Sequence, residues 1–170
     1  MDSRLELPVI ALSKHLHFKE NSNMETKSSE IGPTVHLFLT VAQANVVAEA
    51  LELYARLGLG QIETITELFN EGYIPVNTES GTVDRSPVSQ QIAEHCSAMK
   101  GHMGFSPHGH HGITDRVVSE AAKNAYEVEC VLRKSLALDR DPHPKFRGTE
   151  YDGLLIKCTT EKVPVCVIEG

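Results

Sequence analysis

The chain has 170 residues, close to the size of one ordinary domain and long enough to bury a hydrophobic core. With 41% hydrophobic and 23% charged residues it has the composition of a globular protein, which excludes a fibrous or wholly disordered one. A net charge of -7 excludes broad nucleic-acid binding, which needs a clustered basic face, and no apolar stretch approaches the roughly 18 to 20 residues that cross a bilayer.

The first predicted elements are two strands. Residues 7–20 combine an apolar run with a short alternation of apolar and polar residues, and residues 21–32 form a polar connection. In residues 34–40, Val35, Leu37 and Leu39 alternate with other residues, which predicts a strand with one buried face. We therefore expect residues 1–32 to be an N-terminal strand plus a flexible connection, and residues 33–170 to be the compact domain that the strand joins.

A long helix is predicted to begin after Thr40, because Thr40 and Gln43 have the spacing of a capping box. It should run to about Asn70 and stop at Gly72. Its exposed side carries several glutamates, and Glu52 and Arg56 have i,i+4 spacing. The predicted buried stripe consists of Val47, Leu51, Tyr54, Gly58, Ile62, Ile65 and Phe69.

The segment LGLGQ, residues 57–61, interrupts this helix with two glycines, each costing about 1 kcal/mol relative to alanine inside a helix. One explanation is close helix packing or a local kink at Gly58 and Gly60. The other is that the missing side chains let a ligand approach the backbone beside Gln61. Both explanations stay open from the sequence alone.

Two further helices are predicted. One should begin with Ser86 as N-cap and Pro87 as first residue and close at Gly101, burying Val88, Ile92, Cys96 and Met99. The other should begin between Thr114 and Ser119 and run to about Leu138, before the prolines of residues 139–144. Its predicted stripe is Ala121, Ala125, Val128, Leu132 and Leu136, whereas Glu127 and Glu129 are interpreted as helix surface.

The chain closes with GLLIKCT (residues 153–159) and VPVCVIE (residues 163–169), which predict two strands of a hairpin. Strands at both ends with helices between them are typical of an α+β fold. We expect a single domain in which terminal β-strands form a small antiparallel sheet packed against about three α-helices.

The cysteines indicate the compartment. Cys96, Cys130, Cys158 and Cys166 form no CxxC pair, and no signal peptide opens the chain. We interpret them as buried, reduced thiols and expect a cytoplasmic protein.

Three histidines, His108, His110 and His111, lie within the loop GFSPHGHHG. Zinc needs three or four converging ligands at recognisable spacings, and this loop lacks an HExxH motif or a CxxC pair. The plainer interpretation is a solvated turn that leads into a helix. A zinc site on these histidines is the alternative, and no other cofactor is expected.

Catalytic signatures are lacking in the sequence, which contains no GxSxG elbow, no GxxxxGK[ST] phosphate loop and no GxGxxG motif. This favours a protein that binds a target without transforming it. Arginine offers a planar fork for phosphate or carboxylate, and glutamine both donates and accepts hydrogen bonds. Each candidate is by itself also an ordinary surface residue. The predicted ligand-binding set is Arg56, Gln61, Ser106, Arg133, Asp139 and Arg140.

Four stretches carry a resemblance to a family: residues 50–69 (ALELYARLGLGQIETITELF), 103–113 (MGFSPHGHHGI), 118–142 (VSEAAKNAYEVECVLRKSLALDRDP) and 151–159 (YDGLLIKCT). From about His36 onward the chain resembles an uncharacterised family of small proteins of bacteriophages and bacterial genomes. That family has small or amide residues at the positions of His108 and His110 and an aromatic residue at that of His111. The resemblance therefore implies a loop role for the histidines, and it assigns no activity.

The resemblance implies a short list of functions in the host bacterial cytoplasm. The first is a non-enzymatic anti-defence protein that sequesters a nucleotide-like immune signal between helices or at a subunit interface. The second is an inhibitor or regulator whose acidic surface engages a host protein. The third is a metal-dependent hydrolase that uses His108, His110 and His111. Helix faces rich in alanine and glycine are compatible with a homo-oligomer.

Overall fold

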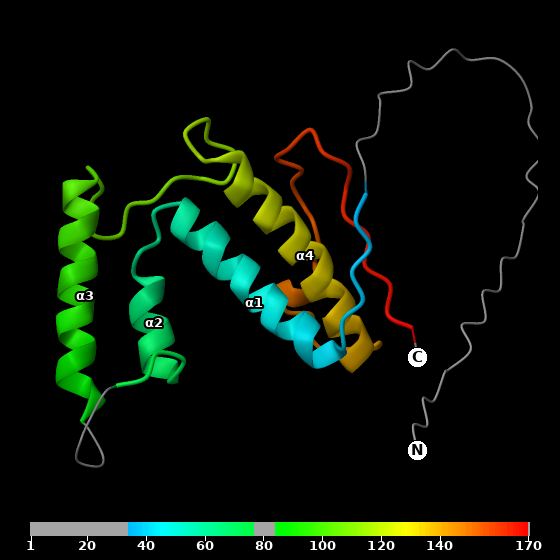
Figure 1. Cartoon of the computed structure of the whole chain (residues 1–170), viewed down its shortest axis with the longest axis horizontal. Coiled ribbons are helices and arrows are strands. Elements are labelled where there is room, and N and C mark those ends of the chain that lie inside the picture. The colour runs from blue at the N-terminus through cyan, green and yellow to red at the C-terminus, as the bar shows by residue number, and fades with distance from the viewer. Residues whose placement is uncertain (1–33, 77–83, 170) are drawn as a thin grey trace, which may run out of the picture. The chain divides into compact units, whose positions relative to one another are not determined.

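The computed structural model describes residues 34–76 and 84–169, and this part of the chain is helical. In chain order the elements are α1 (Val41–Gly58), α2 (Thr64–Glu71), α3 (Arg85–His102), α4 (Glu120–Arg140) and a 3-10 helix, η1 (Thr149–Tyr151) (Figure 1). None of these helices is long and apolar enough to cross a membrane. These helices all lie in the compact unit that begins at Leu37.

The predicted α+β fold is wrong, because residues 34–76 and 84–169 contain no β-strand and therefore no antiparallel sheet. The segments predicted as strands at 34–40, 153–159 and 163–169 have no strand pairing. The strand predicted at residues 7–20 lies outside the part of the chain that the structure describes. The division predicted between residues 32 and 33 stays a prediction, because residues 1–33 are not among those that the structure describes.

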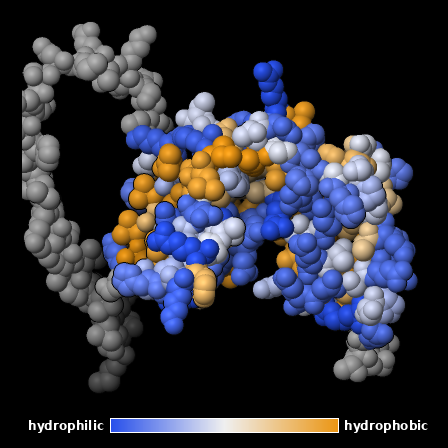
Figure 2. Space-filling model, turned by 180° about the vertical axis from the view of Figure 1, so that it is seen from behind, coloured by the Kyte–Doolittle hydropathy of each residue, from blue (hydrophilic) through white to orange (hydrophobic). Residues whose placement is uncertain are grey.

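The alternation that predicted these strands does not mark a buried face. Leu37 is 71% exposed and Phe38, on the opposite side of the alternation, is 89% exposed. Val165 and Val167 near the end of the chain are also exposed, and Figure 2 shows hydrophobic residues gathered at the surface. Pro164 lacks the N–H that a sheet ladder would need. In these segments the alternation of apolar residues therefore occurs in exposed chain and does not mark the buried face of a strand.

The main packed pair is α1 against α4. The two helices are antiparallel, because Gly58 at the end of α1 meets Ala122 at the start of α4. A Cβ on Gly58 would collide with the Ala122 side chain, so this close approach requires glycine. Small side chains continue along the interface, each at most 8% exposed: Ala44 and Ala55 on α1, and Ala122, Ala125 and Ala137 on α4.

A break at residues 59–63 separates α1 from α2, so the single long helix predicted here is wrong. Gly60 has φ 86°, in the left-handed region that favours glycine. A Cβ on Gly60 would lie 2.8 Å from the ring of Phe105, and the backbone N–H of His111 donates to the Leu59 carbonyl at 2.9 Å. The loop after α3 thus packs into the break, which confirms close packing as the reason for the glycines.

Helix α2 is held to α3 at both of its ends. At the C-terminal end, the Arg85 guanidinium donates to the carbonyls of Phe69 and Ile74 and lies 4.4 Å from the centroid of the Phe69 ring. At the N-terminal end, Lys100 is 1% exposed and donates to Glu63 Oε2 at 2.7 Å. These contacts fix α2, the short helix that forms one wall of the pocket described below.

The caps that begin α1 and end α2 are those that the sequence predicts. Thr40 and Gln43 form the capping box, and Gly72 ends α2 with φ 91°. The Glu52–Arg56 pair is also confirmed, with Nη2 2.7 Å from Oε1.

The start of α3 is predicted wrongly. Asp84, and not Ser86, is the N-cap, because its carboxylate accepts the Ser86 backbone N–H at 3.0 Å and lets the helix begin earlier. The helix also continues past Gly101 to His102, and Met99 in its predicted stripe is 49% exposed.

Helix α4 begins after its N-cap Ser119, inside the predicted window, and ends two residues beyond Leu138. The prediction that Glu127 and Glu129 lie on the surface of this helix is wrong, since Glu127 is 1% exposed and Glu129 is 4% exposed. Glu127 lies on the side of α4 that meets the C-terminal segment, and Glu129 lies beside α1. Both carboxylates are buried by parts of the chain distant in sequence.

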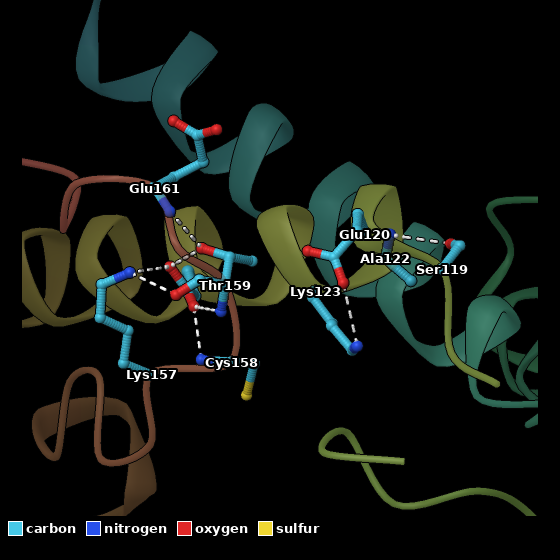
Figure 3. A network of polar contacts seen from close by, with 9 residues as sticks. Ser119, Glu120, Ala122, Lys123, Lys157, Cys158, Thr159 and Glu161 are labelled. Carbon is cyan, nitrogen blue, oxygen red and sulfur yellow. Dashed lines mark hydrogen bonds and ion pairs between the residues drawn. The ribbon is translucent and has the colours of Figure 1, made fainter. Parts of the chain in front are cut away.

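Glu127 holds the C-terminal segment to α4. Its Oε1 accepts the backbone N–H groups of Cys158 at 2.6 Å and Thr159 at 2.7 Å, and its Oε2 accepts the Thr159 hydroxyl at 2.9 Å. Figure 3 shows the Lys157 side chain, the Cys158 backbone nitrogen and Thr159 facing this site, with the Lys157 Nζ 3.9 Å from Glu127 Oε2. Burial alone raises the pKa of Glu127, but these hydrogen bonds and Lys157 hold the pKa below its ordinary value.

Candidate functional site

A pocket of about 260 Å³ lies between α1 and α2. The break at residues 59–63 creates it, because the turn brings one face of each helix to the same space. Four glutamates and one arginine line the pocket: Glu49, Glu52 and Arg56 from α1, and Glu67 and Glu71 from α2. Residues three or four apart share a helix face, so each helix presents two carboxylates to the pocket.

Arg56 connects the two walls of this pocket. Its guanidinium Nη2 lies 2.7 Å from Glu52 Oε1 on its own helix, and Nη1 lies 3.8 Å from Glu67 Oε2 on α2. Glu49 and Glu71 form no ion pair within the described part of the chain. The pocket therefore keeps an excess of negative charge after its own arginine is paired.

Two further side chains add a hydroxyl group and an aromatic ring to the lining of the pocket. Thr64, the first residue of α2, lines the pocket and is 6% exposed, and its hydroxyl has no hydrogen-bond partner among residues 34–76 and 84–169. Tyr73, just beyond α2, also lines the pocket and is 62% exposed. A buried hydroxyl without a partner is costly, which distinguishes this wall from an ordinary packed interface.

A second, smaller pocket of about 130 Å³ lies on the other side of α1, against α4 and η1. Glu49 and Glu52 line this pocket as well, so they form a ridge between the two. Arg133 lines it from α4 and pairs with Glu129, Nη1 to Oε1 at 3.1 Å. Burial raises the pKa of Glu129 above its ordinary value, although the Arg133 charge opposes the rise.

The six residues predicted as a ligand-binding set are only partly brought together. Arg56 lines the first pocket and Arg133 and Arg140 line the second, on either side of the glutamate ridge. The others line neither pocket: Gln61 lies in the break, Ser106 is exposed in the loop after α3, and Asp139 is exposed near the end of α4. The structure thus groups three arginines with glutamates.

The histidine loop is a packed connection. His111 stacks edge-on against Phe105, with ring centroids 5.0 Å apart, and its Nδ1 lies 3.3 Å from Asp115 Oδ2. His110 Nδ1 lies 3.0 Å from the His111 carbonyl oxygen, and His108 is exposed. Within residues 34–76 and 84–169, no three histidine, cysteine, aspartate or glutamate side chains are grouped so that they could hold a metal ion.

The four cysteines are free thiols. Cys96 and Cys130 are buried, as the sequence predicts, while Cys158 and Cys166 are partly exposed. Burial and the neighbouring Glu129 charge together raise the pKa of the Cys130 thiol to about 11, so this sulfur is a poor nucleophile at neutral pH.

No protein-family model, curated protein or solved structure matches this chain. The candidate site is therefore defined by its own geometry, which is an acidic two-sided ridge on α1 with a pocket on each flank.

The sequence predicts Glu49, Glu52 and Glu67 on the exposed side of the helix and assigns them to no site. A usable signal was present, because Glu49 and Glu52 are three apart and Glu67 and Glu71 are four apart, which puts each pair on one helix face. The sequence gives no sign that the two faces meet, since this depends on the turn at Gly60.

Proposed function

We propose that this chain is a non-enzymatic binding protein, an inhibitor or regulator whose acidic surface engages a basic segment of a partner protein. One observation carries the proposal: glutamates outnumber arginines in both pockets, and Arg56 and Arg133 are already paired with them. An incoming anion would meet carboxylates before it met a free arginine. A cationic segment would meet an attractive field.

The sizes of the pockets also support a protein partner. Pockets that enclose a small-molecule ligand usually measure about 300 to 1,000 Å³. The pockets beside α1 measure about 260 and 130 Å³, which is space for single side chains and less than a nucleotide requires. The net charge of -7 adds long-range attraction for a basic partner. The resemblance to phage and prophage proteins supports a host bacterial protein in this role.

The test is a calorimetric titration of the full chain with a basic peptide of alternating glycine, lysine and arginine and with an acidic peptide of the same length. The basic peptide should bind, and its affinity should fall as salt rises from 50 to about 300 mM because surface charges are screened. Equal binding of both peptides, or binding of neither, would refute the proposal. Turnover of a compound by the purified protein would also refute it.

Capture of a nucleotide-like signal is the second candidate, and the smaller pocket is the observation that favours it. The Arg133 Nε is buried without a hydrogen-bond partner in the described part of the chain, and Arg140 lines the same pocket. Since this pocket is too small for a nucleotide, the ligand would have to lie at an interface between two copies. A panel of cyclic and linear nucleotides would then raise the melting temperature and the oligomer size together.

A further inference from the structure

We propose that the pocket between α1 and α2 is the subsite that receives the ammonium or guanidinium group of one lysine or arginine side chain of the partner. This inference rests on the proposed function and adds the place and the chemistry of recognition. The site consists of Glu49, Glu71, Thr64 and Tyr73, beside the internal ion pairs of Arg56.

Arg56 already shows how the pocket holds a cation. Its guanidinium lies between Glu52 on α1 and Glu67 on α2, so one carboxylate from each helix contacts it. Glu49 and Glu71 line the same pocket, one from each helix, and neither forms an ion pair within residues 34–76 and 84–169. A second cation in the pocket would therefore find the same kind of pair.

Thr64 is the independent observation that points to a ligand. Its side chain is 94% buried and its hydroxyl has no hydrogen-bond partner in the part of the chain that the structure describes. Native proteins rarely leave a buried hydroxyl unpaired, and each exception needs an explanation. A lysine ammonium or an arginine guanidinium brings several N–H donors, and one of them can satisfy this oxygen when the Thr64 side chain rotates toward the pocket.

Tyr73 supplies an aromatic face to the same pocket. Its side chain lines the pocket and stays 62% exposed, so an incoming group can reach the ring. Cations bind favourably over the face of tyrosine, and arginine does so most often. Carboxylates, a hydroxyl acceptor and an aromatic ring together match a basic side chain and disfavour an anion.

The volume of the pocket suits one side chain better than a larger ligand. A pocket of about 260 Å³ is below the usual range for small-molecule sites of about 300 to 1,000 Å³. The remainder of a bound basic segment would lie on the surrounding acidic surface. A free amine could place the same ammonium group in the pocket, but without those flanking contacts it should bind less tightly.

The experiment is a ¹⁵N NMR titration of the full chain with three probes. The first is a heptapeptide of glycines with two arginines and a central lysine, the second is the same peptide with citrulline and acetyl-lysine in place of the charged residues, and the third is n-butylammonium. The charged peptide should shift the amides around Thr64 and Tyr73 and bind at least about tenfold more tightly than the other two. Equal affinity of n-butylammonium would overturn the assignment to a partner's side chain.

Matched variants locate the site. Glu49→Gln with Glu71→Gln should weaken peptide binding about tenfold, whereas Glu94→Gln with Glu161→Gln removes the same charge from exposed positions outside the pocket and should weaken it less than twofold. Thr64→Val should weaken it about threefold. Circular dichroism should show the same helix content in all variants.

The outcomes separate the two proposals. Peptide binding that is equally weakened by both pairs of substitutions, or that shifts amides elsewhere, would overturn the subsite and leave the proposed function standing. Binding of no cationic probe by the unmodified chain would overturn both.

Discussion

Glu127 and Thr159 are 32 positions apart and are joined by two hydrogen bonds, from the Thr159 backbone N–H to Oε1 at 2.7 Å and from its hydroxyl to Oε2 at 2.9 Å. Cys158 donates a third hydrogen bond to the same carboxylate. Residues 153–169 form no strand, so this buried side chain takes the place of a sheet ladder in satisfying the backbone donors of Cys158 and Thr159.

Glu127→Ala should therefore lower the free energy of unfolding by about 3 kcal/mol, because hydrogen bonds to a charged acceptor are lost and backbone donors are left unpaired. Urea denaturation measures the loss. Glu161→Ala, at an exposed position on the same segment, is the control and should change stability by less than about 0.5 kcal/mol. A Glu127→Ala variant as stable as the control would show that the carboxylate does not hold the segment.

The buried carboxyl group of Glu129 should make the stability of the protein depend on pH. The sign is opposite to that of a carboxylate whose pKa is lowered by folding. Burial raises its pKa in the folded state despite Arg133, so the folded chain holds this proton more tightly than the unfolded chain. The stability due to Glu129 is then greatest below the unfolded pKa of about 4.3 and falls as the pH rises through the folded pKa.

The measurement is urea denaturation of the wild type and of Glu129→Gln between pH 4 and 8. The wild type should lose stability relative to the variant as the pH rises from about 4.3, and the difference should then level off. A difference that is constant across this range would contradict the raised pKa.

Gly60 and Gly72 form a natural pair of controls for the break between α1 and α2. Both have positive φ, at 86° and 91°, but a Cβ on Gly60 would meet the Phe105 ring whereas a Cβ on Gly72 would meet nothing within 4 Å. Gly72→Ala should lose about 1 kcal/mol through backbone strain, and Gly60→Ala should lose about 1 to 3 kcal/mol more through the clash. Equal losses in thermal or urea unfolding would mean that the Phe105 contact is unimportant.

The helical part of the fold was largely readable from the sequence, because local capping decides where the helices begin and end. Thr40 with Gln43 and Gly72 act at the predicted places, and the N-cap Ser119 is the last residue of the window predicted for the start of α4. Asp84 was overlooked since Ser86 followed by proline is also a good helix start, and a cap two residues earlier replaced it.

The strands and the site were not readable in the same way. Alternation in residues 34–40 and 163–169 has the period of a strand, but pairing depends on a partner that no local pattern specifies. Likewise, Glu127 and Glu129 look like surface residues until the C-terminal segment and α1 cover them. The acidic pocket needs the turn at Gly60, whose direction follows from its contact with Phe105.

Thr64→Val should stabilise the free protein. The substitution keeps the β-branched shape and removes a buried hydroxyl without a partner in the described chain, so unfolding should cost about 1 kcal/mol more. Thr66→Val on the same helix is the matched control, because the Thr66 hydroxyl contacts Cys96 Sγ at 3.8 Å and its removal should be neutral or slightly destabilising. Loss of stability in Thr64→Val would show that the hydroxyl is satisfied in the free protein.

Arg56→Gln separates the two candidate functions most directly. In the wild type Arg56 neutralises Glu52 and Glu67 through partly exposed ion pairs, which contribute at most about 1 kcal/mol to stability, so the variant should stay folded. If the acidic pocket binds a basic side chain, releasing these two carboxylates should tighten binding of the basic heptapeptide about two- to fivefold. If the chain instead captures a nucleotide-like anion at the smaller pocket, which Arg133 and Arg140 line and Arg56 does not, the same substitution should leave that capture unchanged. Calorimetric titration of wild type and variant with the peptide, together with thermal-shift assays against the nucleotide panel, therefore distinguishes the two functions. A variant with unchanged affinity for the peptide would remove Arg56 and its glutamates from the binding surface.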